Sequence, residues 1–420
     1  MKKKPITIFI LFRYIVLITI VSGCVDKNSS STNLTDEGED KLPIYVNMEG
    51  IMKKEGVESL SAIASEINYI PLELTDNSIL RRVSGAVSLN DNYVVYDGSN
   101  ICLYNSEGKY IKTVSQLGQA PSDIRVVIFN VVVDHKGNNL YLFTSHKVIK
   151  FNENADYVHH FQINDGTSGG FTKGAFTSYN TMILAYDNTT IKESDTTTVY
   201  NAIEVDTVGN IINKFVNYSP IYIKDNGARS LIYIPMIDIF KDNVRFMDYS
   251  NDTIFTISDN TMIPYYIFDL GNDKTTFTLD LSINDLGNRA KLDEALDKFK
   301  GHAINGVMEN DNYFFITLTE KGISNNNLIY STYNKQTKEL KRLKNDGLLN
   351  DIDGGPAFFP QKCIGDKMIG WKNADEFKEE ILSMDYNEQK AKYGERFEKV
   401  YQLAKSIKED DNPILIVVKK

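Results

Sequence analysis

Two aspartates, Asp351 and Asp353, stand two positions apart in the segment DIDGGP and have the residue types and spacing of a cation-binding loop. Carboxylates at alternate positions before a glycine begin the calcium loop of an EF-hand, in which further oxygen ligands follow at fixed positions. Those later ligands are missing here and Pro356 follows at once, which favours a structural turn. The side-chain oxygens of both aspartates could still contact a cation such as calcium, or a sugar hydroxyl.

A second polar loop, LGQAPSDI at residues 117–124, carries an amide, a hydroxyl and a carboxylate. Such groups are hydrogen-bonding partners for a polar ligand. Both loops stand between strand-like runs. If the loops lead into strands that line one channel, the tentative ligand contacts are Gln119, Ser122, Asp123, Asp351 and Asp353.

No linear catalytic motif occurs in the chain: HExxH, GxSxG, a phosphate-binding loop and a dinucleotide fingerprint are all missing from the sequence. A metal or acid–base role for histidine would require several side chains to converge. The histidines are expected in turns and strands, at His135, His146, His159, His160 and His302. The sequence therefore names no catalytic residue and no metal ligand, although a fold can still bring distant groups together.

Strand-like runs recur in sets of four, each run rich in β-branched and aromatic residues and bounded by Gly, Asn or Asp. The first set lies within residues 87–114 and contains a tight turn at 106–108. The next sets cover residues 126–163, 175–216, 236–268 and 303–343, and a sixth consists of 357–363, 367–371 and 413–418. Four strands every 45 to 60 residues, roughly, are typical of a β-propeller.

The sixth set is one strand short, whereas residues 67–74, INYIPLEL, form a run without a partner nearby. A ring whose first and last blades were not joined would leave unpaired backbone groups at a sheet edge. We therefore expect residues 67–74 to be the outer strand of the last blade. The predicted fold is an all-β, six-bladed β-propeller of four-stranded antiparallel blades over residues 42–420, closed by an N-terminal strand.

Two segments interrupt the strand pattern, near residues 284–300 and 374–408. Both place apolar residues among many charges with the spacing of an amphipathic helix. We expect helical insertions between blade strands, the second of which separates two strands of the sixth blade. It would be either a solvated cap on the rim or a lid that binds a partner.

The first 23 residues have the pattern of an export signal, with three lysines at positions 2–4 and an apolar stretch that ends in small residues before Cys24. The pattern resembles a bacterial lipoprotein signal, which implies that Cys24 becomes the lipidated first residue of the mature protein. Arg13 interrupts the apolar stretch, so an uncleaved anchor stays open as an alternative. Residues 24–41 are polar without periodicity, which is typical of a disordered tether.

The formal net charge is −10, and removal of the first 23 residues takes away only cations. Nucleic-acid binding requires clustered Lys and Arg, which the rest of the chain lacks, so we expect no nucleic-acid partner. Cys102 and Cys363 have no CxxC neighbour and fit neither a zinc site nor a disulfide framework. Each is expected to pack as a small hydrophobic residue.

Five segments carry a resemblance to a known group of proteins: IPLE at 70–73, QLGQAPSD at 116–123, YSNDTIF at 249–255, DIDGGP at 351–356 and DNPILI at 411–416. Together they look like the six-bladed β-propeller lipoproteins of Bacteroides-type bacteria, which are similar in turn to NHL and TolB-like propellers. The resemblance covers nearly all of the mature chain. It implies the propeller fold and a lipid-anchored place in the cell envelope, on the periplasmic or outer-membrane face, without an established enzymatic activity.

Two functions of different class stay open. The first is a non-catalytic, lipid-anchored scaffold that uses one face of the ring to bind a protein, peptide or glycan and needs no cofactor. The alternative is a hydrolase or lyase that acts on a carbohydrate or lactone with groups from several blades around the central channel. Two carboxylates, or a histidine with carboxylates, a few ångströms apart at the channel mouth would favour the enzyme.

Overall fold

The computed structural model describes residues 42–126, 130–134, 138–144, 147–164, 170–186, 190–192, 196–218, 221–223, 235–248, 251–258, 260–275, 288, 290–291, 294, 300–320, 328–344 and 346–420. All of them belong to one unit, Lys41–Lys420. The expected signal and tether, residues 1–23 and 24–41, lie outside the described residues, as does most of the helical insertion expected near 284–300. None of the described helices combines the length and apolar character needed to span a bilayer.

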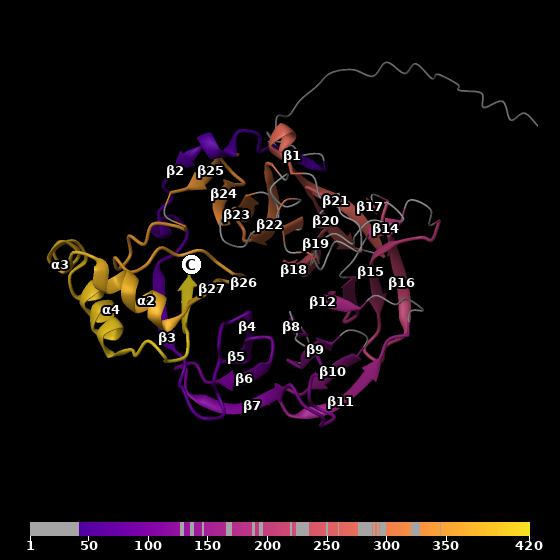
Figure 1. Ribbon diagram of the computed structural model, residues 1–420, viewed down its shortest axis with the longest axis horizontal. Helices are drawn as coiled ribbons and strands as arrows, with labels where there is room; N and C mark the ends of the chain where they lie inside the picture. The colour runs from indigo at the N-terminus through magenta and orange to yellow at the C-terminus, as the bar shows by residue number, and fades with distance from the viewer. Residues whose placement is uncertain are drawn as a thin grey trace, which may run out of the picture. The chain divides into compact units, whose positions relative to one another are not determined.

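Six sheets of four or five strands stand around a common axis as the blades of a propeller (Figure 1). In the first five blades the chain starts at the axis and moves outwards strand by strand. The strands of blades one to three are β4 (Gly85–Leu89), β5 (Asn92–Tyr96), β6 (Asn100–Tyr104), β7 (Tyr110–Gln116), β8 (Val131–Val133), β9 (Leu140–Thr144), β10 (Lys147–Phe151), β11 (Tyr157–Gln162), β12 (Phe171–Phe176), β13 (Met182–Tyr186), β15 (Tyr200–Val205) and β16 (Ile211–Val216). The fold class predicted from the sequence is therefore confirmed.

The other three blades follow the same plan. Their strands are β18 (Met236–Phe240), β19 (Asn243–Met247), β20 (Thr253–Ser258), β21 (Thr261–Asp269), β22 (His302–Glu309), β23 (Tyr313–Glu320), β24 (Leu328–Asn334), β25 (Leu340–Leu343), β26 (Lys362–Ile364), β27 (Lys367–Lys372), β28 (Ile414–Lys419) and β3 (Glu66–Pro71). A separate parallel pair is formed by β14 (Thr190–Lys192) and β17 (Ile221–Ile223).

In blades two and three the second strand is buried along its whole length because neighbouring blades cover both of its faces. The strands β9, LYLFT, and β13, MILAY, are buried at every position. Continuous rather than alternating apolar runs are the signature of a strand buried on both faces. These runs made the blades recognisable in the sequence.

The first described segment runs along the outer edges of three consecutive blades. The strand β1 (Ile44–Asn47) pairs in parallel with β21 of blade four, and β2 (Glu55–Gly56) pairs in parallel with β25 of blade five. The chain then enters β3, the outermost strand of blade six. Such added strands satisfy backbone groups that an exposed sheet edge would leave unpaired. The sequence predicted no helix or strand in residues 42–65, which we call the rim segment.

Ring closure follows the expected route, because β3 pairs antiparallel with the C-terminal strand β28, with Ile70 opposite Leu415. Asn412, only 2% exposed, stands just before β28. Its Oδ1 accepts a hydrogen bond from the Leu80 amide at 2.9 Å, and its Nδ2 donates to the carbonyls of Glu73 at 3.0 Å and Ser78 at 2.7 Å. Since residues 73–80 connect β3 to β4, this one side chain joins the last blade to the first.

The tight turn between β6 and β7 also contacts the closing strand. Gly108 has a φ of +81°, and its carbonyl accepts a hydrogen bond from the Glu73 amide at 2.9 Å. A Cβ atom at this position would lie 2.2 Å from the Pro71 carbonyl oxygen. Only glycine combines this backbone conformation with so close an approach.

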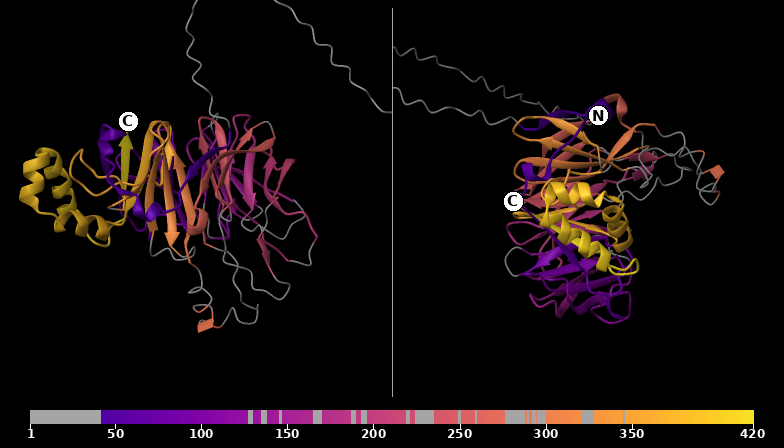
Figure 2. Two further views of the ribbon diagram at one scale, coloured as in Figure 1. Left: turned by 90° about the horizontal axis from the view of Figure 1, so that it is seen from above. Right: turned by 90° about the vertical axis from the view of Figure 1, so that its left-hand side faces the viewer.

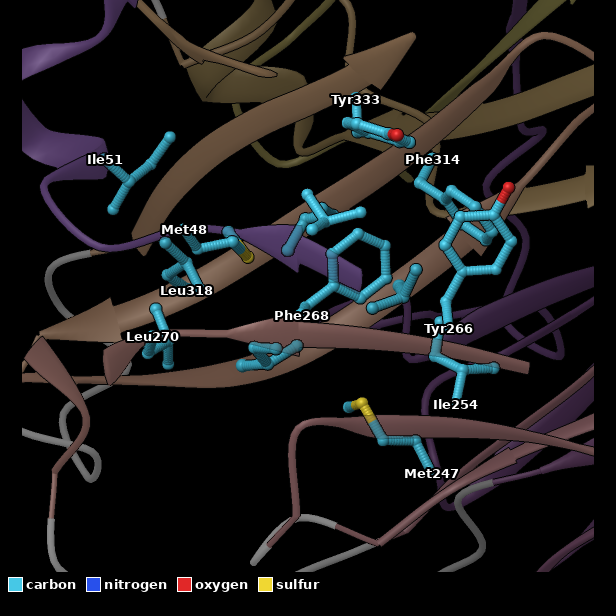
Figure 3. Close-up of a cluster of buried hydrophobic side chains, with 14 of the residues drawn as sticks. Met48, Ile51, Met247, Ile254, Tyr266, Phe268, Leu270, Phe314, Leu318 and Tyr333 are labelled. Carbon is cyan, nitrogen blue, oxygen red and sulfur yellow. The ribbon is translucent and has the colours of Figure 1, made fainter. Parts of the chain in front are cut away.

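Aromatic side chains fill the space between blades, as Figure 3 shows for blades four and five. The rings of Tyr266 and Phe268 lie 4.6 and 5.3 Å from that of Phe314, in edge-to-face arrangements. Met48 and Ile51, from the rim segment, are fully buried in the same cluster. Packing between blades, rather than stacking against a ligand, is therefore the role of these rings.

Three helices occupy the second insertion: α2 (Ala374–Ser383), α3 (Tyr386–Tyr393) and α4 (Glu395–Ser406). Phe377 of α2 and Phe397 of α4 belong to one buried cluster, and the Tyr69 ring of β3 lies 5.4 Å from that of Phe377. Figure 2 shows the helices beside the outer strand of blade six. The expected insertion between β27 and β28 is confirmed, and it packs on the outside of the ring.

Replacement of Asn412 by alanine should weaken ring closure. The change leaves one buried amide and two buried carbonyls without this partner, so we expect a loss of about 2–4 kcal/mol in the free energy of unfolding. Urea denaturation followed by tryptophan fluorescence measures it. Asn154→Ala, at an exposed turn position, is the matched control. Equal stability of the two variants would show that Asn412 does not hold the ring together.

Candidate functional site

A cavity of about 590 Å³ lies on the propeller axis. Each of the six innermost strands, β4, β8, β12, β18, β22 and β26, contributes to its wall, and it extends to turns that follow several of these strands. We call it the channel cavity. Its apolar wall includes Val87, Val131, Ile237 and Ile364.

Two charged side chains from two blades pair at the wall of this cavity, and a third, Lys173, interacts with both electrostatically without lining the cavity. The Lys362 ammonium of β26 pairs with Oδ1 of Asp238 on β18, and that oxygen also accepts a hydrogen bond from the Ile239 amide at 2.9 Å. Lys173, on β12, is half-buried and lies within electrostatic reach of both. Burial and the Lys362 charge lower the pKa of the Lys173 ammonium to about 8, although Asp238 opposes the shift. Among the described residues, Lys173 forms no ion pair.

Glu309 of β22 reaches the cavity from a buried network. This carboxylate, 7% exposed, accepts hydrogen bonds from Arg245 Nε at 2.9 Å, Lys335 Nζ at 2.7 Å and the Tyr265 hydroxyl at 3.1 Å. The Arg245 guanidinium also lies 3.9 Å from the centre of the Tyr265 ring. Removing one partner from a buried ion pair costs about 3–5 kcal/mol in the free energy of unfolding. We therefore expect the intact network to be needed for the stability of the fold.

The remaining charged residues of the wall are Lys241, Asp311, Asp134 and Asp242. Lys241 Nζ pairs with Asp311 Oδ1 at 2.8 Å, and the hydrogen bond from Lys241 lowers the pKa of Asp311. Asp134, 4% exposed, accepts hydrogen bonds from the backbone and the side-chain amide of Asn139 at 3.1 and 2.8 Å. Asp242 is exposed. Four acidic residues of the wall, Asp134, Asp238, Glu309 and Asp311, are thus held by cations or amides.

Cys363 also lines the cavity, and burial raises the pKa of its thiol above the usual range. A thiol in this state is a poor nucleophile. Cys102, in blade one, is buried and its pKa is raised to about 11, again by burial. Both cysteines are free, as expected for small packed side chains.

The loop of residues 117–124 is closed by its own hydrogen bonds. Asp123 Oδ2 accepts from the Ala120 amide at 2.9 Å, the Ser122 carbonyl accepts from the Ser115 hydroxyl at 2.7 Å, and the Arg125 guanidinium donates to the Gln119 side chain. Gln119, Ser122 and Asp123 are not among the residues that line the channel cavity. Their role in ligand contact stays a prediction.

The aspartates of the DIDGGP turn contact other parts of the protein. Asp351 accepts hydrogen bonds from the Ser61 amide at 2.9 Å and the Ser61 hydroxyl at 2.5 Å. Asp353, 6% exposed, accepts at Oδ1 from Tyr69 at 3.1 Å, Asn350 at 2.7 Å and the Gly355 amide at 2.8 Å.

Burial raises the pKa of Asp353, whereas hydrogen bonds from Ser61 outweigh burial and lower that of Asp351. Neither lines the channel cavity, and a calcium contact at either residue stays a prediction. Across the described ranges, no group of three or more His, Cys, Asp or Glu side chains is arranged to hold a metal ion.

No histidine is found among the described residues that line the channel cavity. His159 and His160 lie on β11, the outer strand of blade two, where the His160 ring bonds to the Tyr157 hydroxyl at 2.8 Å. His302 begins β22, and His135 and His146 lie outside the described residues.

The residues that sequence reasoning missed share one signal. Lys173, Asp238 and Lys362 are single charges within short apolar strands, FTKGAF, MIDIF and KCI. A charge at an inner-strand position has to face the channel or find a buried partner. Assigning the first strand of each blade and then looking for charges in it would have found them.

Residues 43–419 match the model of a family described as "Domain of unknown function (DUF4934)". The chain belongs to this family. No curated protein matches this DUF4934 chain.

Three solved structures that are similar to this chain come from bacteria. A Bacteroides fragilis protein named as exported is 15% identical with a TM-score of 0.64, covering 90% of this chain and 99% of its own. A member of the DUF4221 family from Bacteroides vulgatus is 11% identical with a TM-score of 0.46, covering 66% and 84%. Virginiamycin B lyase from Staphylococcus aureus is 10% identical with a TM-score of 0.39, covering 72% and 80%. At these identities the first similarity shows the fold alone, and the other two carry no argument.

The Lys173 amine should react with an acylating reagent with a pH midpoint near 8, since only the neutral amine is nucleophilic. Asp238→Asn should move the midpoint down, because it removes the attractive charge, and Lys362→Met should move it up. Pulse labelling with an N-hydroxysuccinimide ester from pH 6 to 10, read by peptide mass spectrometry, measures the midpoint. Exposed Lys53 is the internal reference. A Lys173 profile identical to that of Lys53 would contradict the described environment.

Proposed function

We propose that this DUF4934 propeller is a binding protein that holds a small polar molecule, or one polar end of a peptide or glycan, in the channel cavity. The observation that carries the proposal is a cavity of about 590 Å³ that all six inner strands build together and that places charged groups on apolar walls. Size and composition of this kind are typical of small-ligand sites. A larger partner would present its polar end to this cavity.

The state of the acidic groups supports binding rather than hydrolysis. Asp238 and Glu309 are tied to cations, and Asp311 is paired with Lys241. A general acid or base has to exchange protons with the substrate near neutral pH, and a carboxylate paired with a cation is a poor proton donor. The alternative, a hydrolase or lyase for a carbohydrate or lactone, would need a carboxylate or histidine at the channel that is free to exchange protons with the substrate.

A bulky side chain in the cavity should abolish binding without unfolding the ring. Ser88 of β4 lines the cavity and is half-buried, so Ser88→Trp fills part of the space. We expect ligands that raise the melting temperature of the wild type to have no effect on this variant. Ser106→Trp, at the exposed turn of blade one, is the matched control and should bind normally.

The screen uses residues 41–420 with mono- and oligosaccharides, amino acids and short peptides, and each hit is measured again by calorimetry. Hits that persist in Ser88→Trp would place the site elsewhere and contradict the proposal. Chemical analysis of each hit after incubation separates the two functions. A converted ligand would favour the lyase or hydrolase.

We further propose that the propeller is held at the cell envelope by a lipid on Cys24, with residues 24–41 as the tether. The signal pattern of the first 23 residues supports this, and so does the exported character of the Bacteroides fragilis relative. A single acyl chain binds a membrane only weakly, so stable anchoring would require more than one chain on this residue.

Cys24→Ser should remove the anchor. We expect the full-length wild type to partition into the detergent phase of a Triton X-114 extract and to incorporate radiolabelled palmitate, whereas the variant does neither. Cys102→Ser, which alters a buried cysteine of the propeller, is the control. Palmitate in the Cys24→Ser protein, or none in the wild type, would contradict lipidation at this residue.

A further inference from the structure

A second open space, of about 630 Å³, lies between blades three and four beside the channel cavity. Its walls are the turns that join β12 to β13, β18 to β19 and β20 to β21, together with facing parts of β15 and β16. We call it the side groove. Asp242, exposed in the turn between β18 and β19, lines both the side groove and the channel cavity. A ligand held in the channel cavity can therefore extend past Asp242 into the side groove.

Uncharged polar side chains make up most of the wall of the side groove: Thr177, Ser178, Thr181, Asn243, Ser258 and Asn260. Hydroxyl and amide groups of this kind both donate and accept hydrogen bonds. The two carboxylates of the wall are those of exposed Asp242 and of Glu204, which is 5% exposed and accepts a hydrogen bond from the Thr181 hydroxyl. No lysine or arginine is found among the described residues that line the groove. Its chemistry therefore suits an uncharged ligand rich in hydrogen-bonding groups.

The turn of residues 177–181 presents an aromatic ring at this groove. Tyr179 lines the groove and is 70% exposed. The Thr177 hydroxyl oxygen accepts hydrogen bonds from the amides of Tyr179 and Thr181, each at 3.2 Å, and lies 2.7 Å from the Thr181 hydroxyl. Because Thr181 is bonded in turn to buried Glu204, the turn is fixed to the body of blade three. A ring on a fixed turn loses little conformational entropy when it contacts a ligand.

The two walls of the side groove are also joined to each other. The Asn213 side chain of β16, in blade three, donates a hydrogen bond at 2.8 Å to the Asn260 carbonyl, in the turn between β20 and β21 of blade four. Asn260 itself lines the groove. This bond sets the separation of the two blades beside the groove, so the groove is formed before a ligand arrives.

We infer that the side groove binds the sugar residues of an uncharged oligosaccharide whose end lies in the channel cavity, with one sugar ring packed against Tyr179. This inference rests on the proposed function and names the class of its ligand. The hydroxyl groups at the edge of a sugar ring both donate and accept, which matches the threonine, serine and asparagine side chains of the wall. The C–H face of the same ring is apolar and packs flat on an aromatic ring, which matches an exposed tyrosine.

A peptide fits the side groove less well than a sugar chain. Peptides that bind in grooves place side chains in apolar pockets. The described wall is made mostly of turns, and its aliphatic side chains are those of Ile212 and Ile257. A basic peptide would depend on Asp242, the exposed carboxylate of the wall, for its counter-charge. It is the alternative that the experiment has to exclude.

The experiment measures protection of tyrosines from nitration by tetranitromethane in residues 41–420. The probes are the hexasaccharides of β-1,4-glucose, α-1,4-glucose, β-1,4-mannose and β-1,4-xylose, each compared with its monosaccharide, and a peptide of three Lys-Gly repeats. Nitration rates are read by peptide mass spectrometry. Tyr45, on β1, is the internal control, because its exposed fraction of 71% matches the 70% of Tyr179.

At least one hexasaccharide, at about ten times its dissociation constant, should slow nitration of Tyr179 about tenfold and leave that of Tyr45 unchanged. Its monosaccharide should leave Tyr179 unprotected, because a single sugar fills only the channel cavity. In calorimetry, Tyr179→Ala should weaken hexasaccharide binding about fivefold or more without changing monosaccharide binding. Tyr179→Phe keeps the ring and should bind within about twofold of the wild type. Tyr45→Ala should bind as the wild type does.

Three results would overturn the inference. In the first, every hexasaccharide at about 5 mM leaves Tyr179 unprotected, although that concentration would fill a site with a dissociation constant of about 0.5 mM. In the second, a hexasaccharide and its monosaccharide protect Tyr179 equally, or Tyr179→Ala binds the hexasaccharide as the wild type does. In the third, the Lys-Gly peptide protects Tyr179 and no saccharide does.

The same variants separate this inference from the proposed function. If ligands found in the screen still require an open channel cavity by the Ser88→Trp test, the proposed function stands while the side groove fails. A hexasaccharide that protects Tyr179 equally well in Ser88→Trp would instead contradict the channel cavity as part of the binding site.

Discussion

A propeller blade has two faces and an edge, and the ring is stable only if all of them are covered. The two faces of each sheet are covered by neighbouring blades, so a break at one place exposes two sheets at once. Here the break is prevented by pairing of β3 with β28 and by the buried side chain of Asn412, which holds the carbonyls of Glu73 and Ser78. The channel cavity depends on this closure, because its wall is formed by strands from all six blades. No single blade contains the site.

The blades could be predicted from the sequence because the information is local. Strands such as LYLFT and MILAY are continuous apolar runs between turns, and their repetition indicates a propeller. Closure by residues 67–74 could also be predicted, since the sixth set of strands was one strand short and residues 67–74 formed a strand-like run without a nearby partner. The rim segment could not: β1 and β2 are short, Tyr45 is 71% exposed, and their partners lie far away in the chain. Nothing in residues 42–56 alone indicates a parallel edge strand.

The site was harder to predict for a related reason. Ligand contacts were expected in polar loops, where Asp351 and Asp353 had a recognisable spacing, but the described contacts of these residues are with Ser61, Tyr69 and Asn350. Lys173, Asp238 and Lys362 stand far apart in the chain and each is alone among apolar residues. Their grouping is a property of the ring, in which equivalent strands meet at the axis. The spacing of residues in the sequence predicts turns and strands well. It predicts which side chains from different blades lie close together only after the innermost strand of each blade has been assigned.

The antiparallel pairing of β3 with β28 also sets an order of events during synthesis. The strand β3 leaves the ribosome early, whereas its partner β28 follows only after the strands of blades one to five have been made. Until then the nascent chain carries an apolar strand with a free edge, which is the kind of surface that promotes misassembly between chains. Contacts between the two ends of a chain form slowly because a long loop has to close. A propeller built this way closes only when β28 is available, and a chain that lacked β28 would leave the inner edge of β3 unpaired.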